Sequence, residues 1–237
     1  MKKDDLLFSL VGVGFGLFFG FSFATWANQR AAASRTSPAR GEGEQSSIAV
    51  ADRGKQSAAE LQAAVRLARE NAKDYDAQMA AARLSYEAER YDDALGFLLR
   101  ANELKPDSLE PVVALGHVNA DARNYQAAEK WFAAALVKEP NDADVRADLA
   151  RTLLLRQPPD YERAAAELRR VLQSDPRHEA ALQFLSFVLA QKGEQGEARA
   201  TVERLAEVNP QNPSIKRLRE EIEARAAAPA AGRDAPR

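Results

Sequence analysis

The two histidines are the residues of this chain best suited to chemistry, because the sequence contains no cysteine. Neither His117 nor His178 belongs to an H-x-x-x-H, H-E-x-x-H, G-x-S-x-G or phosphate-loop pattern. His117 has no metal-ligand partners placed near it in sequence. His178 follows Asp175-Pro176-Arg177 and is predicted to be a solvated turn residue. We therefore expect no catalytic residues, no bound metal and no cofactor.

The charge composition narrows the classes of partner. The chain has 33 basic and 35 acidic residues and a formal net charge of -2. A nucleic-acid-binding protein normally shows an excess of basic residues, so we expect no nucleic-acid partner. The lack of cysteine excludes disulfides and thiolate sites but does not identify a cellular compartment.

Four prolines recur at nearly constant spacing, 34, 36 and 34 residues apart: Pro106, Pro140, Pro176 and Pro210. Twelve positions before each proline stands an alanine, and eight positions before it a bulky apolar residue. The alanines are Ala94, Ala128, Ala164 and Ala198, and the bulky residues are Leu98, Phe132, Leu168 and Val202. A tiny side chain allows two helices to approach closely while the bulky one fills the adjacent space. The period predicts stacked helical hairpins.

The best-formed repeat resembles the tetratricopeptide repeat family. Its matching residues are Leu115-Gly116, Tyr125, Ala128, Phe132, Ala135 and Pro140. Tyr91, Tyr125 and Tyr161 mark the turn between helices in three repeats, and Gln195 takes that place in the fourth. The third repeat has two extra residues around Gln157-Pro158-Pro159-Asp160, which we place in the turn.

The resemblance covers roughly residues 75–210 and implies an all-α solenoid of four helical hairpins with flanking helices. We place the repeats at 75–108, 109–142, 143–178 and 179–212. Apolar spacing predicts a preceding helix from residue 57 and a C-terminal capping helix at 213–225, so the solenoid spans 57–225. The tail at 226–237, rich in Ala, Pro, Gly and Arg, is predicted to be disordered.

The same resemblance implies where a partner would bind. In this family the first helices of the hairpins line a concave groove, and the ninth position of each repeat faces it. Here that position holds Arg83, His117, Arg151 and Phe187, with Met79 and Val113 as apolar neighbours and Asp76, Glu110 and Asp144 at the second position. These residues predict a groove for an extended polar or acidic peptide.

Local pairing on single helices is the alternative explanation of the same residues. Arg83 and Glu87, like His117 and Asp121, are four positions apart, which suits a pair worth a few tenths of a kcal/mol. We favour this alternative over the groove interpretation.

The other informative segment is the N-terminus. Residues 6–26 contain no charged residue, and about 21 helical residues rise roughly 30 Å, the thickness of the hydrocarbon core of a bilayer. The pattern predicts a transmembrane anchor over residues 1–27, followed by a disordered linker over 28–56. A cleaved signal peptide is the alternative, with small-residue sites at Ser22-Phe23-Ala24 or Thr25-Trp26-Ala27. The length of the apolar run favours the anchor.

Gly12, Gly16 and Gly20 lie four residues apart along this segment, on one stripe of a helix. Such a stripe permits close pairing of two membrane helices and hence a homodimer. The alternative is that the glycines only accommodate the neighbouring phenylalanines.

The sequence therefore predicts a membrane-anchored scaffold for protein–protein interaction, in a bacterial envelope complex and without enzymatic activity of its own. The alternatives are a periplasmic chaperone or assembly factor, resembling the repeat subunits of cytochrome c maturation or outer-membrane assembly, and a regulatory subunit of a separate enzyme. We expect a single-pass protein of the bacterial inner membrane. Basic residues on both sides of the span nearly balance, and we place the repeats in the periplasm because a basic tail is awkward to translocate.

Overall fold

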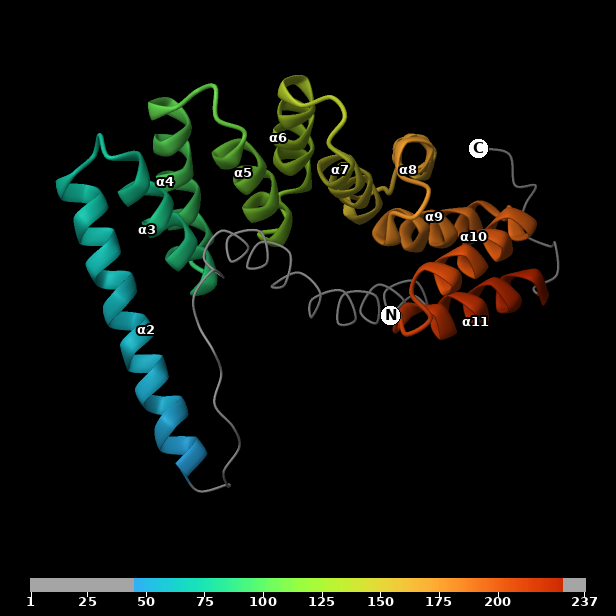
Figure 1. The fold of residues 1–237 in the computed structure, drawn as a ribbon, viewed down its shortest axis with the longest axis horizontal. Coiled ribbons are helices and arrows are strands. Elements are labelled where there is room, and N and C mark those ends of the chain that lie inside the picture. Colours follow the sequence, from blue (N-terminus) through green and yellow to red (C-terminus); the bar gives the residue numbers. More distant parts are fainter. Residues whose placement is uncertain (1–44, 228–237) are drawn as a thin grey trace. The chain divides into compact units, whose positions relative to one another are not determined.

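The structure, a computed structural model, describes residues 45–227 (Figure 1). Within this range the chain forms ten helices and no strand. The predicted anchor, the glycine stripe of Gly12, Gly16 and Gly20, the linker up to residue 44 and the tail from residue 228 lie outside the described residues. None of the helices of residues 45–227 is both long enough and apolar enough to cross a bilayer.

The chain divides into two compact units between residues 123 and 124. The first unit contains four helices: α2 (Gln45–Glu70), α3 (Tyr75–Glu87), α4 (Tyr91–Leu104) and α5 (Glu110–Asp121). The second contains six: α6 (Tyr125–Lys138), α7 (Ala143–Leu155), α8 (Tyr161–Ser174), α9 (Glu179–Lys192), α10 (Gln195–Val208) and α11 (Ser214–Ala227).

Helices within each unit pack as antiparallel neighbours in chain order. In the first unit α2 packs on α3, α3 on α4 and α4 on α5; in the second the same holds from α6 to α11. The second helices begin at the aromatic positions, Tyr91, Tyr125 and Tyr161, or at Gln195 in the last repeat. The predicted fold class, an all-α array of helical hairpins, is confirmed.

The alanine and bulky positions that define the repeat form the core of the second helices. All eight side chains are fully buried: Ala94, Ala128, Ala164 and Ala198 with Leu98, Phe132, Leu168 and Val202. Close helix approach at alanine with a large neighbour beside it is the packing that the sequence pattern requires.

Local sequence explains where the first helices begin and end. Asp74 accepts hydrogen bonds from Asp76 N and Ala77 N, and Asp142 caps α7 in the same way by accepting from Val145 N. Three of these helices are followed by a residue whose backbone has a positive φ, the left-handed conformation that ends many helices: Glu89, Arg123 and Gly193. The third hairpin has no such residue and turns through the predicted insertion instead, between Leu155 and Tyr161.

The ends of the array differ. Helix α11 buries Ile215, Leu218 and Ile222 and leaves Lys216 and Arg219 exposed, which suits a helix that closes the array. Helix α2 begins at Gln45, so residues 45–56 are helical although the sequence pattern placed them in a disordered linker. The apolar spacing from which the helix was predicted starts only at residue 57, so the pattern gave no sign of the earlier turns.

Candidate protein-binding surface

Polar contacts near both ends of α3 and α5 tie these two first helices together in the first unit. The Tyr75 hydroxyl lies 3.3 Å from Ser108 Oγ and donates to Glu110 Oε2 at 3.2 Å. At the other end Tyr86 donates its hydroxyl proton to Asp121 Oδ2. Burial raises the pKa of Tyr75 above its ordinary value, so its phenol remains a proton donor to a higher pH than a solvated tyrosine.

Four partly exposed residues lie between these two ties along the helices. Met79 and Arg83 stand between Tyr75 and Tyr86 on α3, and Val113 and His117 stand between Glu110 and Asp121 on α5. We call Met79, Arg83, Val113 and His117 the central strip. It combines two apolar and two basic side chains.

Arg83 forms the local pair that the alternative interpretation anticipated. Its Nη1 lies 2.6 Å from Glu87 Oε1, and the two side chains are 42% and 46% exposed. A pair with that much solvent around it contributes about 0.3–0.5 kcal/mol, little enough for a competing carboxylate to replace Glu87.

The second unit has corresponding ties. At one end of α7 and α9, His178 Nε2 lies 3.1 Å from Asp144 Oδ1. Between α9 and the turn before α11, Asn212 Nδ2 donates to Glu179 Oε1 at 2.6 Å. At the far end, Gln191 of α9 bonds to both Glu221 and Arg225 of α11.

The predicted site residues of the second unit differ in exposure. Phe187 is partly exposed on α9, whereas the Arg151 side chain on α7 is buried, with only 7% of the residue exposed. Arg151 therefore has little surface to offer a partner, although it occupies the same repeat position as Arg83. Of the predicted acidic row, Glu110 and Asp144 are engaged in the ties, and Asp76 is exposed.

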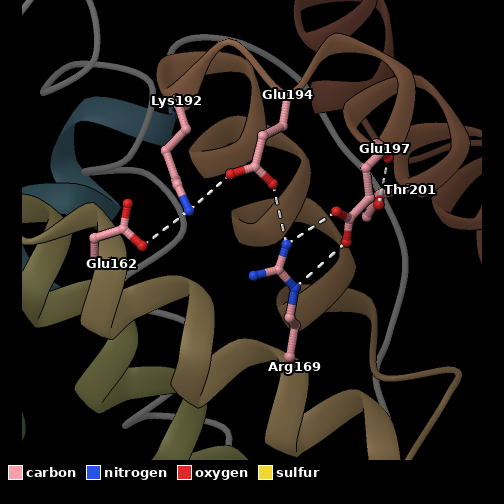
Figure 2. Close-up of polar contacts among 6 residues, drawn as sticks. All are labelled: Glu162, Arg169, Lys192, Glu194, Glu197 and Thr201. Carbon is pink, nitrogen blue, oxygen red and sulfur yellow. Dashed lines mark hydrogen bonds and ion pairs between the residues drawn. The ribbon is translucent and has the colours of Figure 1, made fainter.

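An ion-pair network holds the second helices of the last two hairpins together (Figure 2). Arg169 of α8 reaches Glu197 of α10 at 2.9 Å and Glu194 at 3.2 Å. Lys192 bridges Glu194 and Glu162, at 2.7 Å and 2.9 Å. The hydrogen bond from Lys192 holds the pKa of Glu194 below its usual value, and the bond to Glu197 raises the pKa of Arg169. These charges are satisfied within the fold, so they serve packing between hairpins.

The described residues contain no group of three or more His, Asp or Glu side chains arranged to hold a metal ion. A shallow pocket of about 450 Å³ lies beside the start of α11, lined by Pro210, Pro213, Lys216 and Arg219 among others. The Arg219 guanidinium is already paired with Glu203 at 2.6 Å.

The family model for the tetratricopeptide repeat matches residues 155–222, which span α8, α9, α10 and most of α11. This segment of the chain carries tetratricopeptide repeat sequence. No curated protein sequence matches it significantly.

Solved structures of similar fold include tetratricopeptide repeat proteins. YrrB, described as a TPR protein with an unusual peptide-binding site, is 15% identical, with a TM-score of 0.59 over 72% of this chain and 87% of YrrB. MamA is 17% identical, with a TM-score of 0.58 over 64% of this chain and 87% of its own. A tetratricopeptide repeat protein from Parabacteroides merdae is 16% identical, with a TM-score of 0.59 over 64% of this chain and 60% of its own. At these identities the likeness shows the fold alone.

Tetratricopeptide repeats generally act as scaffolds for protein–protein interaction, with an extended surface along the stacked hairpins. The fold therefore supports a protein or peptide partner, as the sequence predicted.

Sequence reasoning missed the ties between first helices. Their partners are separated by 33 to 35 residues: Tyr75–Ser108, Tyr86–Asp121, His178–Asp144 and Gln191–Arg225. This separation is close to the repeat length, so complementary polar residues one repeat apart were the available signal. His178, predicted to be a solvated turn residue, is in fact a tie residue whose side chain is 10% exposed.

Proposed function

We propose that this chain is a membrane-anchored tetratricopeptide scaffold that binds an extended segment of a partner protein on the central strip. The observation that carries the proposal is the position of Met79, Arg83, Val113 and His117. They are partly exposed on adjacent first helices, between ties that already occupy the polar residues at both ends.

The chemistry of the strip indicates the chemistry of the partner. Met79 and Val113 offer apolar contact, and Arg83 offers a guanidinium whose pair with Glu87 is exposed and exchangeable. A segment that alternates apolar and acidic side chains suits this arrangement, because its carboxylates can take the place of Glu87 at Arg83. The peptide-binding site named for YrrB is consistent with a peptide as the ligand type.

Charge reversal of the strip tests this assignment. In the full chain, Arg83→Glu with His117→Glu should abolish partner capture while leaving the far-UV circular dichroism unchanged. Arg90→Glu is the matched control, because Arg90 is also about half exposed, with 47% of its side chain accessible, and also forms a local ion pair, with Asp93. It is the N-cap residue of α4 and is not part of the central strip.

Capture is best measured by site-specific photo-crosslinking from position 79 or 113 in intact cells. A discrete crosslinked species that disappears in the double variant and persists in Arg90→Glu supports the proposal. A species that persists in the double variant means that the partner binds elsewhere and that Arg83 serves only its local pair.

The membrane component of the proposal rests on residues 6–26, which contain no charged residue. We place the chain in the bacterial inner membrane with the repeats in the periplasm, as part of an envelope complex. Alkaline extraction should leave the full chain in the membrane fraction and release a chain that lacks residues 1–27. Protease added to spheroplasts should digest the repeats, and protection there would place them in the cytoplasm.

A chaperone or assembly factor and a regulatory subunit of an enzyme remain the competing functions. Purification from detergent-solubilised membranes separates them. One stoichiometric partner supports a complex subunit, and an enzymatic activity in that partner identifies a regulatory role. Many unfolded clients support a chaperone.

A further inference from the structure

His178 contacts two different helices through its two ring nitrogens. Its Nδ1 accepts the backbone N–H of Ala181 at 3.2 Å, which makes it the N-cap of α9. Its Nε2 lies 3.1 Å from Asp144 Oδ1 on α7. One ring therefore both caps a helix and ties it to the preceding repeat.

These two contacts require one particular form of the imidazole. An acceptor nitrogen must keep its lone pair, so Nδ1 carries no proton while it caps α9. The single proton of the neutral ring is then on Nε2, where it is donated to Asp144. A second proton can enter only at Nδ1, the nitrogen that faces the Ala181 N–H.

The charged groups around the ring come from two elements. Helix α7 contributes Asp144 and Asp148, and the turn before α9 contributes Asp175. The hydrogen bond to Asp144 is the main cause that raises the pKa of His178 above its ordinary value, and burial opposes it. Protonation therefore occurs at a higher pH than for a solvated histidine, and the contact with Asp144 becomes stronger as the pH falls.

Protonation has the opposite effect on the helix cap. With a proton on both nitrogens, Nδ1 becomes a donor and can no longer accept from Ala181. The first turn of α9 then has one more unsatisfied N–H group. In addition, the new positive charge lies at the N-terminal end of the helix, where the helix dipole is itself positive, and this destabilises that turn.

We propose that His178 is a proton-operated helix cap: with one ring proton it holds the first turn of α9, and with two it releases that turn while keeping its bond to Asp144. The first turn of α9 belongs to the helix that carries Phe187 and borders the tie at Glu179. Acidification therefore loosens one end of a first helix without separating it from its neighbour.

The starting state is tested directly on the wild-type chain by nitrogen NMR with selectively labelled histidine. The chain has only two histidines, and His117→Gln assigns their signals. At a pH well above the midpoint of its titration, the ring of His178 should carry its single proton on Nε2. A proton on Nδ1 at that pH overturns the proposal.

Hydrogen exchange at the Ala181 amide then tests the release. After correction for intrinsic exchange, protection in the wild-type chain should fall about fivefold as the pH drops through the NMR midpoint of His178, the factor expected for loss of a typical N-cap. Asp144→Asn should move this midpoint to lower pH, because it removes the carboxylate that favours the second proton.

His178→Asn is the matched control, since asparagine caps helices well and does not titrate in this range. Its protection at Ala181 should be independent of pH. Wild-type protection that stays constant through the midpoint refutes the release, and this measurement remains decisive if the asparagine variant does not fold.

Discussion

Replacing Ala164 with leucine tests the packing that defines the repeat. Ala164 lies on α8 with 0% of its surface exposed, and α8 packs on both α7 and α9. Leucine adds three carbon atoms, and no exposed surface remains at that position through which they can leave the core. The helices must move apart or the side chain must adopt a strained rotamer, at a cost of about 1–3 kcal/mol.

The same substitution two residues later is the control. Ala166 is exposed on the same helix, so Ala166→Leu should change the free energy of unfolding by less than about 0.5 kcal/mol. In a chain of this size, about 2–4 °C of melting temperature corresponds to 1 kcal/mol. Thermal unfolding of the purified chain by circular dichroism should therefore show a fall of about 2–12 °C for Ala164→Leu and almost none for Ala166→Leu.

An unchanged midpoint for Ala164→Leu would refute the packing argument, because the position would then have room that the structure does not show. Equal falls for both variants would attribute the effect to leucine on α8 in general rather than to the contact between helices.

Three further outcomes follow from other parts of the chain. Gln195→Met should raise stability by about 1–3 kcal/mol, since both amide atoms of Gln195 are buried without a hydrogen-bond partner in the described part of the chain; a lower melting temperature would mean that the amide has a role. Arg169→Met should cost about 0.5–1 kcal/mol at low ionic strength and almost nothing near 1 M salt, because the pairs of Arg169 with Glu194 and Glu197 are partly solvated; a loss independent of salt would point to packing instead. Gly16→Ile should abolish self-association of residues 6–26 in a membrane two-hybrid assay, and a signal that survives the substitution undiminished would exclude pairing through the glycine stripe.

The fold was predictable because the residue types that recur in each repeat are those that the packing between its helices requires. Alanine at one position and a bulky residue four positions later recur in phase with the prolines, and the structure buries all of them. The start of α2 was not predictable in the same way. Residues 45–56 show no clear apolar period, and a helix that continues without such a period leaves no signal beyond propensity.

Arg83 and Arg151 show why the candidate site was harder to predict. Both occupy the ninth position of a repeat, yet Arg83 is partly exposed and paired with Glu87, whereas Arg151 is buried. Aligning the repeats identifies equivalent backbone positions but not the side chains that surround each one. Exposure depends on residues of neighbouring helices, which vary from repeat to repeat.

The ties between first helices suggest how such an alignment is better used. A contact such as Asp144 with His178 joins the second position of one repeat to the residue just before the next one, 34 residues later. Asp144 is ordinary in its column, whereas His178 stands where the other repeats have Asp74, Ser108 and Asp142. The pair itself becomes visible only when adjacent repeats are compared across columns. Because each repeat contacts chiefly its neighbours, the energetic unit of this fold is the junction between repeats. Residues that the junctions leave unused, such as Met79 and Val113, are then the first candidates for contact with a partner.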